Sequence, residues 1–165
     1  MKPLKLLLAL SCVGALATAG VAFGQSAHSS GASVIVKTSK TKYGTILVTS
    51  SGLALYLDKG DKPPHFACTG GCLSAWPPLK ATGTLKAQGA AKASKLSSVK
   101  GPGGKMVTYN GHPLYTFTSD SKGKITGEGV NGFYVVSPNG SKITKAPKST
   151  TSSTTSSSSS NGYGY

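Results

Sequence analysis

The sequence predicts an all-β, antiparallel domain built from two hairpin-containing repeats, arranged as a sandwich or a barrel-like structure. Residues 46–61 (ILVTSSGLALYLDKGD) and 105–120 (KMVTYNGHPLYTFTSD) match at six positions without a gap, which indicates an internal duplication. Each copy contains two short β-prone segments separated by a turn. The stretch between the copies predicts no more than a turn or two of helix, in AAKASKLSSV.

The expected strands follow one another along the chain. SVIVK, before the first copy, is interpreted as an early edge strand. The first repeat contributes TILVT and LALYL on either side of SSG, and the second contributes KMVTY and PLYTF on either side of NGH. Asn110-Gly111 strongly indicates a two-residue turn, because both residues tolerate a positive φ. GFYVVSP predicts one further strand, which ends at Pro138.

Composition divides the chain into a leader, a folded part and a tail. The expected segments are a signal peptide (1–24), a linker with the edge strand (25–40), a two-repeat domain (41–146) and a disordered tail (147–165). Within the domain, repeat one covers 43–79, a connector 80–104 and repeat two 105–140. The Ser/Thr-rich tail has no apolar face that could offset the entropy of ordering it. A domain of this size has a marginal core and gains from a covalent staple.

The N-terminal segment predicts export. Lys2 and Lys5 precede the apolar run LLLALSCVGALATAGVAF, and cleavage is expected after Gly24 or, as a second choice, after Ala19. An uncleaved membrane anchor is the alternative, because the run is just long enough to span a bilayer. Lipidation at Cys12 is a further alternative, although the preceding Ala-Leu-Ser departs from a lipoprotein box. We therefore expect a secreted or cell-envelope protein, either periplasmic or extracellular.

The charge of the chain is strongly positive and comes from lysine alone. Eighteen basic residues face four acidic ones, for a formal net charge of +14, and none of the basic residues is Arg. Reading of bases and bidentate capture of phosphate favour Arg, so sequence-specific binding of nucleic acid is not expected. The scattered lysines instead predict loose attraction to anionic cell-wall polymers or to a membrane surface.

The stretch HFACTGGCLSAWPPL contains the only two cysteines left after signal cleavage. In an oxidising compartment such a pair predicts a disulfide, which would fix the intervening Thr-Gly-Gly turn and set Trp76 against the core. A redox-active dithiol is one alternative. A copper or zinc site is another, because thiolate and imidazole suit both metals. Its candidate ligands are His65, Cys68 and Cys72, with Met106 or His112 as a fourth.

The repeated Tyr and Asp residues have two interpretations. In the structural one, the aromatic side chains, including Phe117, point into the core, since alternate residues of a strand share a face. Asp61 and Asp120 would then accept backbone N–H groups of the following turns, or a Tyr hydroxyl of the other repeat. In the functional one, Tyr56, Asp61, Tyr115 and Asp120 form a pseudo-symmetric site for a hard cation such as Ca²⁺, or for a sugar.

No catalytic constellation stands out in the sequence. The histidines have no adjacent Ser or acid that would suggest a triad, and Glu128 is the sole Glu. The GxGxxG pattern at 127–132 is interpreted as a turn, because the dinucleotide fingerprint needs a strand before it and a helix after it. We therefore expect a protein without enzymatic activity and without a cofactor.

A family resemblance rests on these same motifs. Tyr115-Thr116-Phe117-Thr118-Ser119-Asp120 fits the pattern Tyr-x-(Phe/Trp/Tyr)-x-x-Asp, and the first copy keeps its Tyr and Asp but has Asp58 at the aromatic position. With CTGGC, AWPPL and GEGVNGFYVVSP, this motif makes residues 43–140 resemble bacterial secreted or lipoprotein repeats. The resemblance implies an exported, cell-surface, β-rich repeat protein, and it brings no established activity or ligand. The weak box at Cys12 departs from the lipoproteins of the family.

The expected function is that of an exported cell-envelope module, non-enzymatic and either structural or binding. The alternative is an envelope protein that handles a metal or thiol redox chemistry through the His65/Cys68/Cys72 loop. A carbohydrate or wall-polymer binder is a third hypothesis. The sequence does not identify a small-molecule ligand.

Overall fold

The computed structural model describes residues 32–144 of the chain. The predicted signal peptide, Cys12 and the predicted tail lie outside the described residues. Within 32–144, no helix has the length and apolar character needed to cross a membrane.

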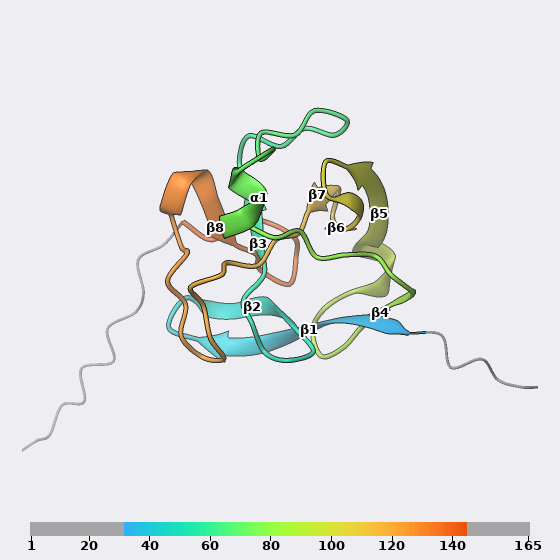
Figure 1. The fold of residues 1–165 in the computed structure, drawn as a ribbon. Coiled ribbons are helices and arrows are strands. Elements are labelled where there is room, and N and C mark those ends of the chain that lie inside the picture. Colours follow the sequence, from blue (N-terminus) through green and yellow to red (C-terminus); the bar gives the residue numbers. More distant parts are fainter. Residues whose placement is uncertain (1–31, 145–165) are drawn as a thin grey trace, which may run out of the picture. The chain divides into compact units, whose positions relative to one another are not determined.

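Short strands make up nearly all of the regular structure, which confirms the all-β prediction (Figure 1). The strands group into three small sheets, ordered β2-β1-β4, β3-β8 and β5-β6-β7. Pairing is antiparallel except between β1 and β4, which are parallel. The elements are β1 (Ser33–Thr41), β2 (Gly44–Thr49), β3 (Tyr56–Asp58), α1 (Cys72–Ala75), β4 (Thr84–Ala87), the 3₁₀ helix η1 (Ala93–Lys95), β5 (Leu96–Gly101), β6 (Gly104–Tyr109), β7 (His112–Pro113), the 3₁₀ helix η2 (Val130–Gly132) and β8 (Phe133–Val135).

The connector between the repeats contains more structure than the sequence predicted. β4 pairs with β1, so β1 is the central strand of its sheet and the expectation of an edge strand was wrong. The expected helix is a single 3₁₀ turn, followed directly by β5. The four-residue TLKA pattern of β4 was too short to identify as a strand, because it is defined by its partner rather than by its own periodicity.

The two hairpins share one register, and this register corrects the gap-free alignment. β1 and β2 pair from Val36 with Thr49 down to Thr41 with Gly44. β5 and β6 pair in the same way, each residue 60 positions further on, from Leu96 with Tyr109 down to Gly101 with Gly104. Beyond the turn the offset falls to 59. The second copy is one residue shorter there, because Asn110 and Gly111 both adopt a positive φ and close a tight turn.

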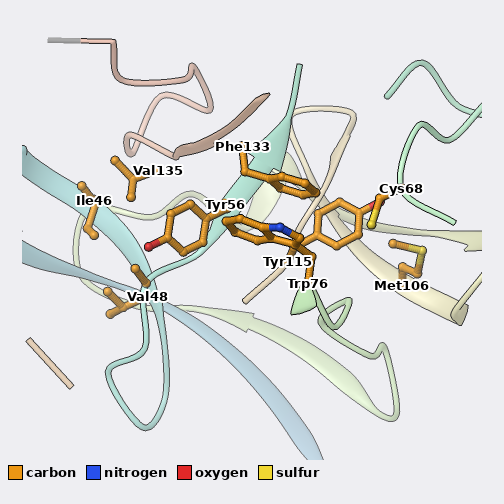
Figure 2. Close-up of a cluster of buried hydrophobic side chains, with 10 residues drawn as sticks. Ile46, Val48, Tyr56, Cys68, Trp76, Met106, Tyr115, Phe133 and Val135 are labelled. Carbon is orange, nitrogen blue, oxygen red and sulfur yellow. The ribbon is translucent and has the colours of Figure 1, made fainter. Parts of the chain in front are cut away.

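Both repeats contribute to a shared core. Ile46 and its counterpart Met106 lie in one buried cluster, whereas the next residues, Leu47 and Val107, lie in the other. This alternation follows from the strand period of two, which sends successive side chains to opposite faces. Trp76 is at the centre of the first cluster, with the Phe133 ring over its own (Figure 2). The core is therefore built between the repeats rather than within each of them.

Candidate functional site

The repeated motif brings the two repeats together at a pseudo-twofold axis. Tyr56 and Tyr115, which occupy equivalent positions, exchange both backbone hydrogen bonds, with N···O distances of 2.9 Å each way. Beside them Trp76 stacks on Phe133, with ring centroids 3.8 Å apart and an interplanar angle of 5°. These two aromatic residues occupy equivalent places, each immediately before the closing segment of its repeat. The symmetry axis therefore passes through the aromatic cluster.

The closing segment of each repeat, which contains its last residues, forms backbone hydrogen bonds with the other repeat. Leu79, near the end of repeat one, donates its N–H to the Leu114 carbonyl of repeat two at 2.8 Å. Val136, near the end of repeat two, donates its N–H to the Leu55 carbonyl of repeat one at 3.1 Å. β3 of repeat one likewise pairs with β8 of repeat two. The repeats are interlocked, so neither one contains all the partners of its own strands.

The motif tyrosines and aspartates form two reciprocal side-chain bonds across the same axis. The Tyr56 hydroxyl donates to Asp120 Oδ2 at 2.5 Å, and the Tyr115 hydroxyl donates to Asp61 Oδ2 at 2.6 Å. We call these four residues the cross-clasp. Burial, and secondarily the bond to the aspartate, raises the pKa of both tyrosines well above the usual value. Both therefore remain protonated donors at neutral pH.

The other oxygen of each aspartate anchors the turn that follows it. Asp61 Oδ1 accepts the Ala67 N–H at 2.8 Å, and Asp120 Oδ1 accepts the Thr126 N–H at 2.7 Å. In residues 32–144 no buried side-chain nitrogen or oxygen lacks a hydrogen-bond partner. The hydrogen-bonding capacity of the cross-clasp is thus used inside the fold, which favours the structural interpretation over a cation or sugar site.

The third motif position differs between the repeats. Phe117 stacks on the face of Trp76, with centroids 4.3 Å apart, and so extends the aromatic cluster. Asp58, which replaces the aromatic residue in repeat one, is buried, and its Oδ1 accepts the Gly60 N–H at 2.8 Å. Burial raises the pKa of Asp58, and the bond from Gly60 partly opposes this rise. The position packs the core in one repeat and holds a turn in the other.

The predicted disulfide between Cys68 and Cys72 is present. Cys68 is fully buried in the aromatic cluster, and α1 begins at Cys72, whose carbonyl accepts the Trp76 N–H at 2.9 Å. The bridge therefore closes the turn that leads directly into the central tryptophan. No free thiol remains among the described residues, because the only two cysteines there are joined.

The alternative metal ligands do not converge. Met106 is buried in the core, His65 is exposed in a turn, and His112 lies half-buried in β7. Within 32–144, no three His, Cys, Asp or Glu side chains lie close enough to hold a metal ion. The copper or zinc hypothesis also requires thiolates, which the disulfide removes. The structure gives this hypothesis no support.

The GxGxxG segment has a packing role. It leads through η2 into β8, so a strand follows it rather than the helix that a dinucleotide site requires. A Cβ added at Gly127 would lie 2.7 Å from Trp76 Cη2 and 3.0 Å from Tyr56 Cζ, so only glycine fits there. Glu128 accepts the Val135 N–H at 2.6 Å, and burial raises the pKa of its carboxyl, opposed by this bond.

Every acidic side chain is hydrogen-bonded within the fold, whereas most of the described lysines face the solvent. Each of the four acidic side chains accepts a hydrogen bond from a backbone N–H. Four of the 18 lysines, at positions 2, 5, 145 and 148, lie outside the described residues. Of the fourteen that remain, all but Lys37 and Lys95 are exposed. The described surface is therefore basic over most of its extent.

Two cavities open on this basic surface. The larger, of about 490 Å³, lies between the tip of the β1–β2 hairpin and residues 123–126 of repeat two, and we call it the hairpin cavity. Lys40, Lys42 and Lys124 line it above an apolar floor, and none of its lining residues is acidic. The smaller, of about 320 Å³, is lined by Lys59, Lys142 and His112 among others. Sequence reasoning missed both, because each draws on segments that are far apart in the chain.

The chain belongs to the lipoprotein family described as a secreted repeat of unknown function. The family profile matches residues 37–80 and 97–136, which confirms the resemblance inferred from the motifs and the presence of two repeats. The second match begins inside the segment interpreted as a connector, in agreement with the place of β5 in the second hairpin. Searches of curated proteins and of solved structures gave no match. The family description indicates a secreted protein and assigns no activity.

Proposed function

We propose that the protein is an exported, non-enzymatic binding module of the cell envelope, whose lysine-rich surface holds anionic polymers. One observation carries the proposal: the acidic side chains are all engaged within the fold, while twelve lysines are exposed among the described residues. Membership of a secreted family supports a location outside the cytoplasm.

The motif chemistry supports a binding role rather than a catalytic one. Proton transfer at neutral pH needs a group whose pKa lies near 7. The tyrosines of the cross-clasp are moved away from that range by burial, and their partner carboxylates are bound on both oxygens. The residues repeated in both copies therefore hold the fold, and function falls to the surface around them.

Lysine sets the character of the binding. Its ammonium is a compact, strongly hydrated charge on a flexible stem, so it attracts anions without the fixed geometry of a guanidinium. Exposed pairs of this kind contribute roughly 0–1 kcal/mol each and are screened beyond a Debye length of about 8 Å at physiological ionic strength. Useful affinity thus requires a partner with many charges, such as an acidic cell-wall polymer, and it weakens with salt.

Retention on an acidic polymer tests the proposal. The secreted protein is applied to immobilised polygalacturonate and to neutral dextran at about 50 mM and about 500 mM NaCl. Vesicles with and without anionic phospholipid are assayed in parallel. We expect retention on polygalacturonate at the lower salt concentration, strong weakening at the higher one, and no retention on dextran. Folded protein that binds no acidic polymer at low salt would overturn the proposal.

A further inference from the structure

We infer that the hairpin cavity is a binding site for an acidic saccharide unit, a sugar that carries a carboxylate or a phosphate. The inference rests on the proposed function and gives it a defined location. At about 490 Å³ the cavity has the size of a small-molecule site, for which about 300–1,000 Å³ is typical.

The lining of the cavity is complementary to such a ligand, because it combines an apolar floor for the sugar ring with positive charge for the acidic group. Its floor is formed by Ile125, which is half-buried, together with Ile46, Val48 and Ala54, which are almost completely buried in the core. Lys40, Lys42 and Lys124 supply positive charge around this floor. A sugar ring has apolar C–H faces and a polar edge, so it can lie on the floor while its acidic group meets the ammonium groups.

The carboxylate that is bonded to the cavity lining is already engaged in hydrogen bonds within the fold. Thr126 lines the cavity, and its N–H and Oγ1 both donate to Asp120 Oδ1, at 2.7 and 2.8 Å. The second oxygen of Asp120 accepts the Tyr56 hydroxyl. Charges beside a low-dielectric apolar wall interact more strongly than charges on an open surface. An anion in the cavity therefore meets three lysines, and the oxygens of Asp120 behind the lining are bonded to donors of the protein.

The equivalent place in the other half of the molecule is filled. There Phe66 corresponds to Ile125 of the cavity, and Gly101 corresponds to Thr41. A Cβ added at Gly101 would lie 3.0 Å from the Phe66 ring and 2.5 Å from Met106 Sδ, so the aromatic ring occupies this space. The hairpin cavity is thus a feature of one half, not a consequence of the fold that both halves share.

The charges around the two places differ in the same direction. Lys42 in the cavity corresponds to Pro102, and Lys124 corresponds to His65. Lys122, which packs against Gly52 at the edge of the cavity, corresponds to Pro63. The half with the open cavity therefore also has the additional lysines. Space and positive charge therefore coincide at the hairpin cavity and are both reduced at the equivalent place.

Two charge-matched variants of the secreted protein separate this site from the general surface charge. Lys40→Gln/Lys124→Gln removes two charges from the cavity, and Lys86→Gln/Lys100→Gln removes two exposed charges elsewhere. The probe is trigalacturonate, followed by calorimetry and by NMR shifts, with uncharged maltotriose as control and glucose 6-phosphate to distinguish phosphate from carboxylate. We expect the cavity pair to weaken binding about tenfold or more and the control pair by less than about threefold.

A filling variant tests the space without changing the charge. Thr41→Gly/Ile125→Phe transplants the residues of the filled half, and near-UV circular dichroism checks that the core is intact. We expect this variant to lose trigalacturonate binding and to keep the salt-sensitive retention on polygalacturonate. If it does not fold, the two charge pairs still decide the question.

The outcomes separate the two proposals. Equal weakening by both charge pairs would overturn the cavity site and leave the general binding function intact. Equal affinity for maltotriose, or binding only to anionic vesicles, would also overturn it. Failure of the wild-type protein to bind either polygalacturonate or trigalacturonate would instead overturn the proposed function, and the cavity site with it.

Discussion

The two repeats share the residues that join them to each other and differ in the residues that act at only one of the two equivalent places. Both contribute a Tyr and an Asp to the cross-clasp, and the closing segment of each forms backbone hydrogen bonds with the other repeat. Only repeat one has a disulfide, and its central aromatic residue is Trp76 where repeat two has Phe133. Only the first hairpin borders the hairpin cavity, where it faces residues 123–126 of repeat two, because Phe66 fills the equivalent place at the second hairpin.

This contrast indicates which features hold the fold and which are free to specialise. A residue that bonds across the axis serves both halves, so its loss weakens the contacts of both. A residue whose contacts differ between the copies can be replaced, as Cys68, which forms the disulfide, is replaced by Gly127, which packs against Trp76. The shared motif therefore stabilises the fold, and the residues that differ give each repeat its individual role.

The largest expected effect is at Trp76. It is 2% exposed and lies between Phe133 and Phe117, so Trp76→Ala should lower the free energy of unfolding by about 3–5 kcal/mol. Trp76→Phe, which installs the residue of the other repeat, should cost clearly less. Urea unfolding followed by circular dichroism measures both. Equal losses would mean that the two aromatic positions are not equivalent in their packing.

The two tyrosine hydroxyls of the cross-clasp should contribute differently to the free energy of unfolding. Tyr115→Phe removes the donor to Oδ2 of Asp61, which is 4% exposed, whereas Tyr56→Phe removes the donor to Oδ2 of Asp120, which is only half-buried. A buried charged acceptor that loses its partner costs about 1.5–3 kcal/mol, and solvent relieves part of this cost for Asp120. We expect Tyr115→Phe to be the more destabilising of the two in chemical denaturation. The opposite order would contradict the burial argument.

The disulfide should contribute less than the tryptophan beside it. Its two cysteines are four residues apart, so the loop that it closes is short and its effect on the unfolded chain is about 2 kcal/mol. Cys68→Ala/Cys72→Ala should therefore lower the melting temperature while the protein still folds. Repeat two folds without such a bridge, so complete loss of structure in this variant would show that the repeats depend on different supports.

High pH should reveal the raised pKa values of the clasp tyrosines. Well below pH 10, the ordinary tyrosine pKa, the native and the unfolded protein both hold these protons. The contribution of the two tyrosines to the free energy of unfolding is therefore constant there. Above pH 10 the unfolded chain loses protons that the native tyrosines retain, so the free energy of unfolding falls as pH rises. Unfolding measured on either side of pH 10 should show this slope. The double variant Tyr56→Phe/Tyr115→Phe should flatten it, and an unchanged slope would contradict the assignment.

Sequence patterns were sufficient for the class of fold because alternating strands and a repeated motif are local signals. The pairing of Tyr56 with Asp120 was not local: the sequence allowed a bond between repeats without saying which strands would exchange. β4 was missed because four residues carry too little periodicity to define a strand. The single-residue gap at the hairpin turn was missed because Val48 and Val107 align by identity. The strand registers instead make Thr108 the counterpart of Val48, since Val48 pairs with Lys37 and Thr108 pairs with Ser97.

The hairpin cavity shows a different limit of sequence reasoning. Its lysines are scattered in the chain, and they gather only because repeat two folds back onto the first hairpin. Comparison of the two copies did contain a signal, since Phe66 and Gly101 are replaced by Ile125 and Thr41. That signal can be recognised only when the strand register is known, because equivalent residues are 60 positions apart before the turn and 59 positions apart after it.

The tyrosine and aspartate that the two copies share are bonded between the copies, and a double-mutant cycle tests this arrangement most directly. The cross-repeat pair combines Tyr56→Phe with Asp120→Asn, and the within-repeat pair combines Tyr56→Phe with Asp61→Asn. We expect a coupling energy of about 0.5–3 kcal/mol for the first pair and near-additive effects for the second. Equal coupling in both pairs, or a larger value within the repeat, would contradict the interlocked arrangement.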